Sequence, residues 1–383
     1  MNKIFRIVIT ALCLLCVVAL CACGDDTQTP STDNGTPIDY ILEDSFTKIV
    51  MVLEKYEKAL VDIDSYVSEY GVDDNVLKAY CAVSDNFVNV ATLLKPAEVA
   101  EFYGKFFSVV SECRYTDAKY RDEMQLYASD DFSLMFLLSS GALKADAIDA
   151  ETVDDLFFVR DTAMKMLTYS SKCDADVLSV LKHIDKFTEN NKDKLAAYSD
   201  KINLLTLLNR ATRVLIDKDL KDDSMDKVKS DVSALASSFE ASFAPYYLAD
   251  AMNKKDQSAA EGYFADIMTA TADNAELCDK NLSLVYAFEK RAEKDTLRVS
   301  ALEANKNAFC YTLGELDDYA KEAGFLQGDV LLKVGDSAIY NASQLYDLTN
   351  SGTAAEFTVL RAGEEIKVNA LSLDEIELIP TLR

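Results

Sequence analysis

Few residues in this chain have the types and spacing that catalysis or metal binding requires. His183 is the only histidine among 383 residues, and it lies in the helical run VLSVLKHIDKF beside apolar positions. A single histidine excludes multi-histidine metal sites and leaves one candidate for any histidine-dependent triad. The pattern favours a histidine on the flank of a helix over a catalytic base, so we predict no catalytic residue here.

The acidic residues also lack the spacing of a cation site. Asp217, Asp219, Asp222 and Asp223 are clustered, but they do not form an Asp-x-Asp-x-Asp-Gly loop closed by a glutamate, as calcium binding would require. The chain contains no Gly-rich phosphate loop followed by Lys and Ser or Thr, and no Gly-x-Ser-x-Gly elbow. We therefore predict neither a metal nor a cofactor.

The first residues have the composition of a targeting segment. Lys3 and Arg6 precede an apolar run over 7–19 that is too short to span a bilayer comfortably. The run LCACG at 20–24 resembles the bacterial lipobox, in which the cysteine after a small residue is lipidated. We predict a signal peptide over 1–22, a lipid on Cys23 and a disordered tether over 23–37. The alternative is an ordinary cleaved secretion signal.

The lipobox places the folded part on the extracytoplasmic side of a bacterial membrane, in the cell envelope. The formal net charge of −26 would repel nucleic acid and anionic lipid headgroups, so we predict no nucleic-acid partner. The remaining five cysteines are far apart, odd in number and without metal-ligand spacing, which favours buried thiols over disulfides. They are Cys81, Cys113, Cys173, Cys278 and Cys310.

Apolar residues recur at helical spacing over residues 38–303, where glycine and proline are scarce. This pattern predicts an all-helical domain of antiparallel helices in one or two bundles, without a tandem repeat. The best internal boundary is a break at 141–149. The expected helices are 38–70, one opened by Pro96, 151–169, 175–187, 195–216, 225–243 and 259–294.

The pattern changes past about Ala308. Runs of strand formers at 309–313, 330–334, 357–361 and 365–368 are separated by two short helical runs, 316–323 and 343–348, and by glycine turns. We predict a small α+β domain over 304–375, followed by a C-terminal tail over 376–383. The fold class is therefore mostly α, with a large helical region followed by a small α+β domain.

The order of these elements resembles the PDZ domain of bacterial envelope proteases of the high-temperature-requirement type. The run AGFLQGDVLL matches the most recognisable motif of that family, with Gly324, Gly328 and Asp329 at its fixed positions. Gly335, which opens the turn after the second strand, stands where the family usually has Asn-Gly. Residues 296–302 could supply the groove strand, but they also continue the preceding helix.

The resemblance implies that the domain binds extended peptides by strand addition at a sheet edge. The groove would be formed by Phe309 and Tyr311 from the edge strand and by Gln344 and Leu348 from the helix. Each of these residues could equally be part of the core of a small domain. The partners implied are protein or peptide segments, and the membrane through the lipid anchor.

We therefore expect a membrane-anchored lipoprotein that binds protein segments through a PDZ-like groove and scaffolds envelope proteins. One alternative is an envelope enzyme or protease accessory factor whose helical body acts on substrate that the PDZ-like domain delivers. Another is a solute-binding lipoprotein, although that class alternates strands and helices, which most of this chain does not. The sequence does not identify the partner.

Overall fold

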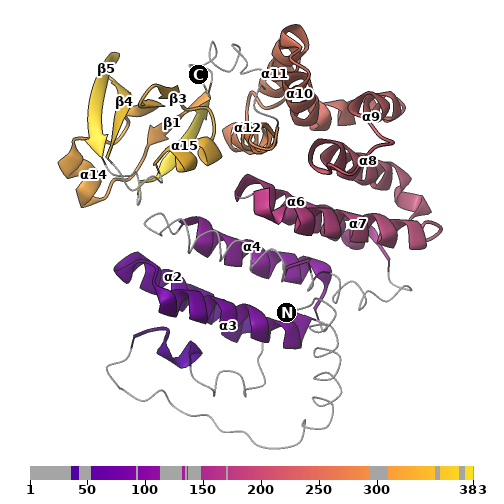
Figure 1. Cartoon of the computed structure of the whole chain (residues 1–383), viewed down its shortest axis with the longest axis horizontal. Coiled ribbons are helices and arrows are strands. Elements are labelled where there is room, and N and C mark those ends of the chain that lie inside the picture. Colours follow the sequence, from indigo (N-terminus) through magenta and orange to yellow (C-terminus); the bar gives the residue numbers. More distant parts are fainter. Residues whose placement is uncertain are drawn as a thin grey trace, which may run out of the picture.

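The computed structural model describes residues 36–42, 53–91, 94–112, 132–133, 136, 148–169, 171–292, 309–349, 354–370 and 376–382. The expected signal peptide, the lipidation site Cys23, nearly all of the tether, Cys113 and residues 296–302 lie outside these ranges, as does most of the expected boundary at 141–149. The fold class is as the sequence predicts: a mostly helical chain that ends in a small antiparallel sheet (Figure 1).

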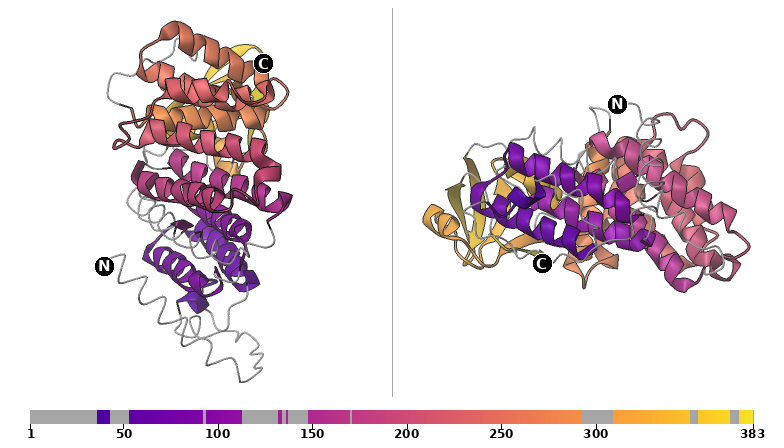
Figure 2. Two further views of the ribbon diagram at one scale, coloured as in Figure 1. Left: turned by 90° about the vertical axis from the view of Figure 1, so that its right-hand side faces the viewer. Right: turned by 90° about the horizontal axis from the view of Figure 1, so that it is seen from below.

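The helices lie one above another in the left view of Figure 2. Gly71, with φ of +76°, ends the first long helix, and Pro96 opens the third, as the sequence indicates. The helices are α2 (Leu53–Tyr70), α3 (Asp74–Ala91), α4 (Pro96–Glu112), α6 (Ala150–Tyr169), α7 (Asp174–Asn190), α8 (Ser199–Ile216), α9 (Met225–Val232), α10 (Ala244–Asn253), α11 (Gln257–Ala270) and α12 (Ala275–Glu289), with 3-10 turns η1 (Asp39–Ile41), η2 (Ser171–Cys173), η3 (Ala196–Tyr198) and η4 (Ser237–Phe243).

The expected helix 38–70 begins with the 3-10 turn η1 at 39–41, and two further expected helices are broken. The run 259–294 divides into α11 and α12 because Asn274 accepts a hydrogen bond from the Leu277 N–H and so caps a new helix. The run 225–243 divides into α9 and η4, with Ala236 in an extended conformation between them. Apolar periodicity continues through both breaks, and it therefore did not reveal them.

Aromatic rings form the core of the first three helices. Phe87 stacks on Phe102 with ring centroids 3.8 Å apart, and Tyr80 stacks on Phe106 at 3.6 Å. Tyr56 meets both Phe87 and Phe102 edge-on. All five side chains are at most 1% exposed, so α2, α3 and α4 are joined by ring packing that excludes water.

The C-terminal part is an antiparallel sheet with two short helices, α14 (Asp318–Ala323) and α15 (Ala342–Thr349). The strand order is β5-β4-β2-β1-β6, and β3 pairs with β2. The four predicted strands are present, but the expected tail contains a further strand that pairs with β1 along its whole length. The strands are β1 (Phe309–Leu313), β2 (Val330–Val334), β3 (Ser337–Ala338), β4 (Ala355–Arg361), β5 (Glu364–Ala370) and β6 (Leu378–Leu382).

The buried apolar residues form two clusters, and their division does not follow the expected boundary at 303/304. One cluster runs from η1 through α10 and includes Phe288 of α12. The other joins α10, α11 and α12 to the sheet, so that Leu282 of α12 belongs to the same cluster as Tyr311 of β1 and Leu345 of α15. The last helices of the body therefore share their core with the C-terminal part.

Candidate functional site

The Gly-Asp motif of the C-terminal part makes a structural contact, called here the Asp329–Arg361 lock, that joins a loop to a hairpin. Asp329 is 2% exposed, and its carboxylate accepts hydrogen bonds from Arg361 Nε (2.8 Å) and Nη2 (2.6 Å) and from the Leu326 N–H (2.9 Å). Arg361 Nη2 also donates to Gly324 O, where the chain leaves α14 with φ of +104°. This bidentate pair ties the glycine loop to the β4–β5 hairpin.

The other motif glycines occupy turn positions. Gly328 has φ of +88°, and its N–H donates to Leu313 O. Gly335 has φ of +58° and begins the turn between β2 and β3. The resemblance thus singled out residues that set the backbone path.

Phe309 and Tyr311 do not lie on an edge strand, and this part of the sequence prediction is wrong. β1 has β2 on one side and β6 on the other, with Phe309 opposite Leu382 and Tyr311 opposite Pro380. Both aromatic side chains are nearly inaccessible, at 2% and 1% exposure. An extended peptide cannot add to β1 because the end of the chain itself fills that place.

The two predicted groove residues of the helix also have structural partners. Gln344 is 8% exposed; its Oε1 accepts from the Tyr340 N–H and its Nε2 donates to Ala338 O, which fixes the loop before α15. Leu348 is partly buried and packs against the second core cluster. Gln344 is therefore held by the loop before α15, and Leu348 is partly covered by the core.

The outer edge of β6 is poorly suited to strand addition. The Leu313 N–H donates to Asp329 O, and Leu313 O accepts from the Gly328 N–H. The odd-numbered residues of β1 therefore direct their backbone N–H and C=O groups toward β2. Pro380, the partner of Tyr311, therefore faces the outer side. Because proline has no N–H, the middle of that edge lacks a donor.

A stripe of α12 contacts the C-terminal part through side chains that the sequence did not single out. Asp279 Oδ1 accepts from Tyr311 Oη (2.5 Å) and from the Ala342 N–H (2.9 Å) at the start of α15. Further along α12, Tyr286 Oη and Lys290 Nζ both donate to Asp347 Oδ2, at 2.9 and 2.7 Å. These contacts hold α12 against α15 and β1, and α12 lies beside α15 in Figure 1.

Burial is the main cause of the pKa shifts of the two residues at the centre of this contact, Asp279 and Tyr311. Burial raises the pKa of Asp279, although hydrogen bonds from Tyr311, the Ala342 N–H and Ser283 oppose the rise. Burial next to that carboxylate also raises the pKa of Tyr311 well above its ordinary value. The Tyr311 hydroxyl therefore keeps its proton at physiological pH and donates it in the hydrogen bond to Asp279. Burial makes the charged form of the Asp279 carboxyl less favourable than it is in water.

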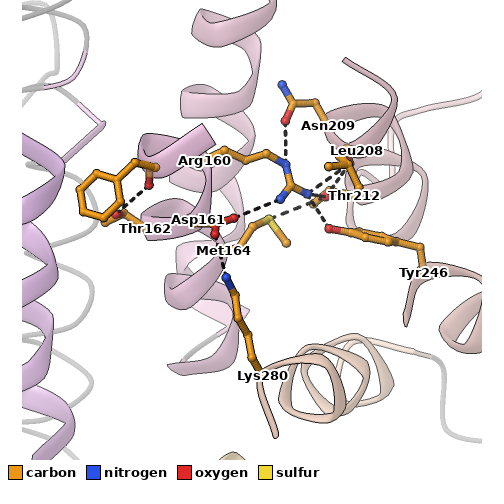
Figure 3. Close-up of polar contacts among 10 residues, drawn as sticks. Arg160, Asp161, Thr162, Met164, Leu208, Asn209, Thr212, Tyr246 and Lys280 are labelled. Atoms are coloured by element: carbon orange, nitrogen blue, oxygen red, sulfur yellow. Dashed lines mark hydrogen bonds and ion pairs between the residues drawn. The ribbon is translucent and has the colours of Figure 1, made fainter. Parts of the chain in front are cut away.

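A second polar cluster surrounds Arg160 of α6, which is 4% exposed (Figure 3). Its Nε donates to Asn209 Oδ1 (3.1 Å), and its Nη2 donates to Thr212 Oγ1 (3.3 Å) and Tyr246 Oη (2.5 Å). The acceptors come from α8 and α10, so one guanidinium joins three helices. The position could have been suspected from the sequence, because Arg160 follows Val159 on the apolar face of a helix.

The remaining sequence candidates have structural surroundings. The His183 ring nitrogen Nδ1 lies 2.6 Å from Ser179 O, one turn back on the same helix. Cys173, Cys278 and Cys310 are buried thiols, and Cys81 is a half-buried one. Within the described ranges, no three His, Cys, Asp or Glu side chains converge as ligands of one metal ion, and no described helix has the length and apolar character to cross a bilayer.

Comparison of the chain with protein-family models, with curated proteins and with solved structures gives no match. The site is therefore assigned from its own geometry. At the contact between α12 and the C-terminal part, an ion pair and several hydrogen bonds join polar groups of two elements.

Proposed function

We propose that the protein is a membrane-anchored extracytoplasmic lipoprotein that binds segments of other proteins through its C-terminal part and scaffolds envelope proteins. The N-terminal resemblance to a lipobox supports the anchor, and the order of elements over 309–370 supports a PDZ-like module. The strand β6 changes the expected mode of binding, because the inner edge of that module is already paired.

One observation carries the proposal: the α15 side of the module already recognises a protein segment. Tyr286 and Lys290 of α12 converge on Asp347 of α15, while Asp279 meets the first N–H of α15. Each contact pairs a hydrogen-bond donor with an acceptor, as in the interfaces of transient protein complexes. A surface of this kind suits a binding protein.

A peptide-display selection on the full chain, with Cys23→Ser to remove the lipid, tests the proposal. We expect enrichment of a peptide family whose binding weakens at least fivefold in the Asp347→Lys variant, because a cation then replaces the acceptor on α15. No enriched family, or peptides that bind both chains equally, would contradict the proposal. Turnover of casein or labelling by a serine-reactive probe would favour the enzyme alternative instead.

A further inference from the structure

The residues of α12 that contact the module follow helical spacing. Asp279, Tyr286 and Lys290 stand at positions i, i+7 and i+11, which places them on one stripe of the helix. Ser283, between them on the same stripe, is buried and donates to Asp279. A strand would present every second residue, so this surface is matched to a helix.

The module presents the complementary pattern. At one end, Tyr311 Oη and the Ala342 N–H offer two donors to a carboxylate. At the other, Asp347 offers an acceptor to a hydroxyl and an ammonium group. Beside them, the Tyr340 ring meets the Tyr286 ring edge-on at 6.3 Å, and Tyr340 Oη lies 3.3 Å from Glu289 Oε2.

A neighbouring face of α12, and the residues that directly follow the helix, hold it to the body. Lys280 Nζ pairs with Asp161 Oδ2 of α6 at 2.7 Å, and Arg291 Nε pairs with Asp174 Oδ1 at 2.7 Å. These pairs belong to a different stripe from Asp279, Tyr286 and Lys290. The contact with the module can therefore be weakened without altering the contact with α6.

We propose that the α15 side of the module is a helix-binding surface and that α12 is its resident occupant. This inference rests on the proposed function and names its class of partner, which is an amphipathic helix. That helix carries a carboxylate at position i, an aromatic hydroxyl at position i+7 and a cation at position i+11. Such a helix competes with α12 for the donors of Tyr311 and Ala342 and for Asp347. Release of α12 returns the desolvated Asp279 carboxylate to water, which favours exchange. It also opens the apolar contact of Leu282 with the cluster that holds Tyr311 and Leu345, and the incoming helix must restore that contact.

The probe for this inference is a fluorescent peptide of residues 275–290 (AELCDKNLSLVYAFEK), capped at both ends. It is titrated into the full chain and into the double variant Tyr286→Ala, Lys290→Ala. In the double variant, α12 lacks its two hydrogen bonds to Asp347. We expect the double variant to bind the peptide roughly tenfold more tightly than the unaltered chain, because the competing internal contact is lost. A peptide carrying Asp279→Ala should bind the double variant roughly tenfold more weakly.

A charge exchange provides the matched control. Asp347→Lys added to the double variant should weaken the natural peptide about two- to fivefold, and a peptide with Lys290→Asp should recover the loss. Circular dichroism of each chain checks that α12 has not unfolded. If a chain has unfolded, the charge exchange is repeated on the chain with its natural Tyr286 and Lys290.

Equal binding to the unaltered chain and the double variant would overturn the inference, as would indifference to Asp279→Ala. Enrichment of extended peptides by display, together with failure of the helical probe, would leave the proposed function standing and remove the inference alone. Failure of both experiments would remove the proposed function as well.

Discussion

The aromatic core of α2, α3 and α4 and the contact between α12 and the C-terminal module represent two ways of joining elements. In the first, five buried rings pack in stacked and edge-on pairs whose centroids lie 3.6 to 6.3 Å apart. In the second, Asp279, Tyr286 and Lys290 bridge to α15 and β1 through hydrogen bonds beside an apolar core that α12 shares with the sheet. A close-packed cluster of buried rings cannot lose one ring without leaving a cavity. A hydrogen-bonding group, in contrast, can exchange one partner for another of the same kind. On our proposal, the junction at the N-terminal end is permanent and the junction at the C-terminal end is exchangeable.

Substitution of a ring in the permanent junction should have the largest effect. Phe102→Ala removes a ring that is 1% exposed and stacks on Phe87 at 3.8 Å, so we expect a loss of about 3–5 kcal/mol in the free energy of unfolding. Urea denaturation measures it. Phe158→Ala, at a side chain that is 45% exposed, is the control and should change stability by no more than about 0.5 kcal/mol. Similar losses for both would mean that the rings do not form the core described.

Removal of the lock inside the module should have the next largest effect. Arg361→Ala leaves the Asp329 carboxylate, whose side chain is 1% exposed, without its bidentate partner. We expect a loss of about 2–3 kcal/mol, at the low end for a broken buried pair because Arg361 is partly exposed. Lys367→Ala on the same hairpin breaks only the exposed pair with Glu356. It should cost much less in the same urea titration, and an equal loss would contradict the role of the lock.

The exchangeable junction should show itself in the pH dependence of stability. Because burial raises the pKa of Asp279 above 3.8, the folded state binds this proton more tightly than the unfolded state. The free energy of unfolding should therefore fall as the pH rises through the raised pKa. Asp279→Asn stays neutral and keeps an acceptor oxygen, so this part of the decline should disappear.

The measurement compares urea unfolding of the Asp279→Asn and unaltered chains at about pH 4 and about pH 7. We expect the variant to gain stability, relative to the unaltered chain, on going to the higher pH. Asp219→Asn, at an exposed loop position, controls for the general effect of charge removal. A stability difference between variant and unaltered chain that does not change with pH would show that Asp279 is not desolvated by α15 and β1.

The sequence predicted the elements better than their partners. Gly71, Pro96 and the run from Gly324 to Val334 mark their turns and strands because local backbone preferences decide them. β6 was not predicted: residues 376–383 were expected to be a tail, although Pro380 is compatible with the outer edge of a sheet. Phe309 and Tyr311 were expected on an edge strand because the PDZ resemblance implies one, and β6 fills that edge.

The contact residues of α12 could not be found by pattern. Asp279, Tyr286 and Lys290 are polar positions on a helix, and polar positions ordinarily face water. Only the tertiary packing of residues far apart in the chain, 32 positions for Asp279 and Tyr311 and 57 for Lys290 and Asp347, makes them partners. The break at Asn274, which sets where α12 begins, was likewise concealed by continuous apolar periodicity.

Hydrogen exchange of the amides of α15 tests the central claim most directly, namely that α12 occupies an exchangeable surface of the module. In the full chain, the double variant Tyr286→Ala, Lys290→Ala should speed exchange in α15 roughly tenfold, while exchange in α2, α3 and α4 stays unchanged. Unchanged protection of α15, or an equal rise in exchange throughout the molecule, would contradict the account.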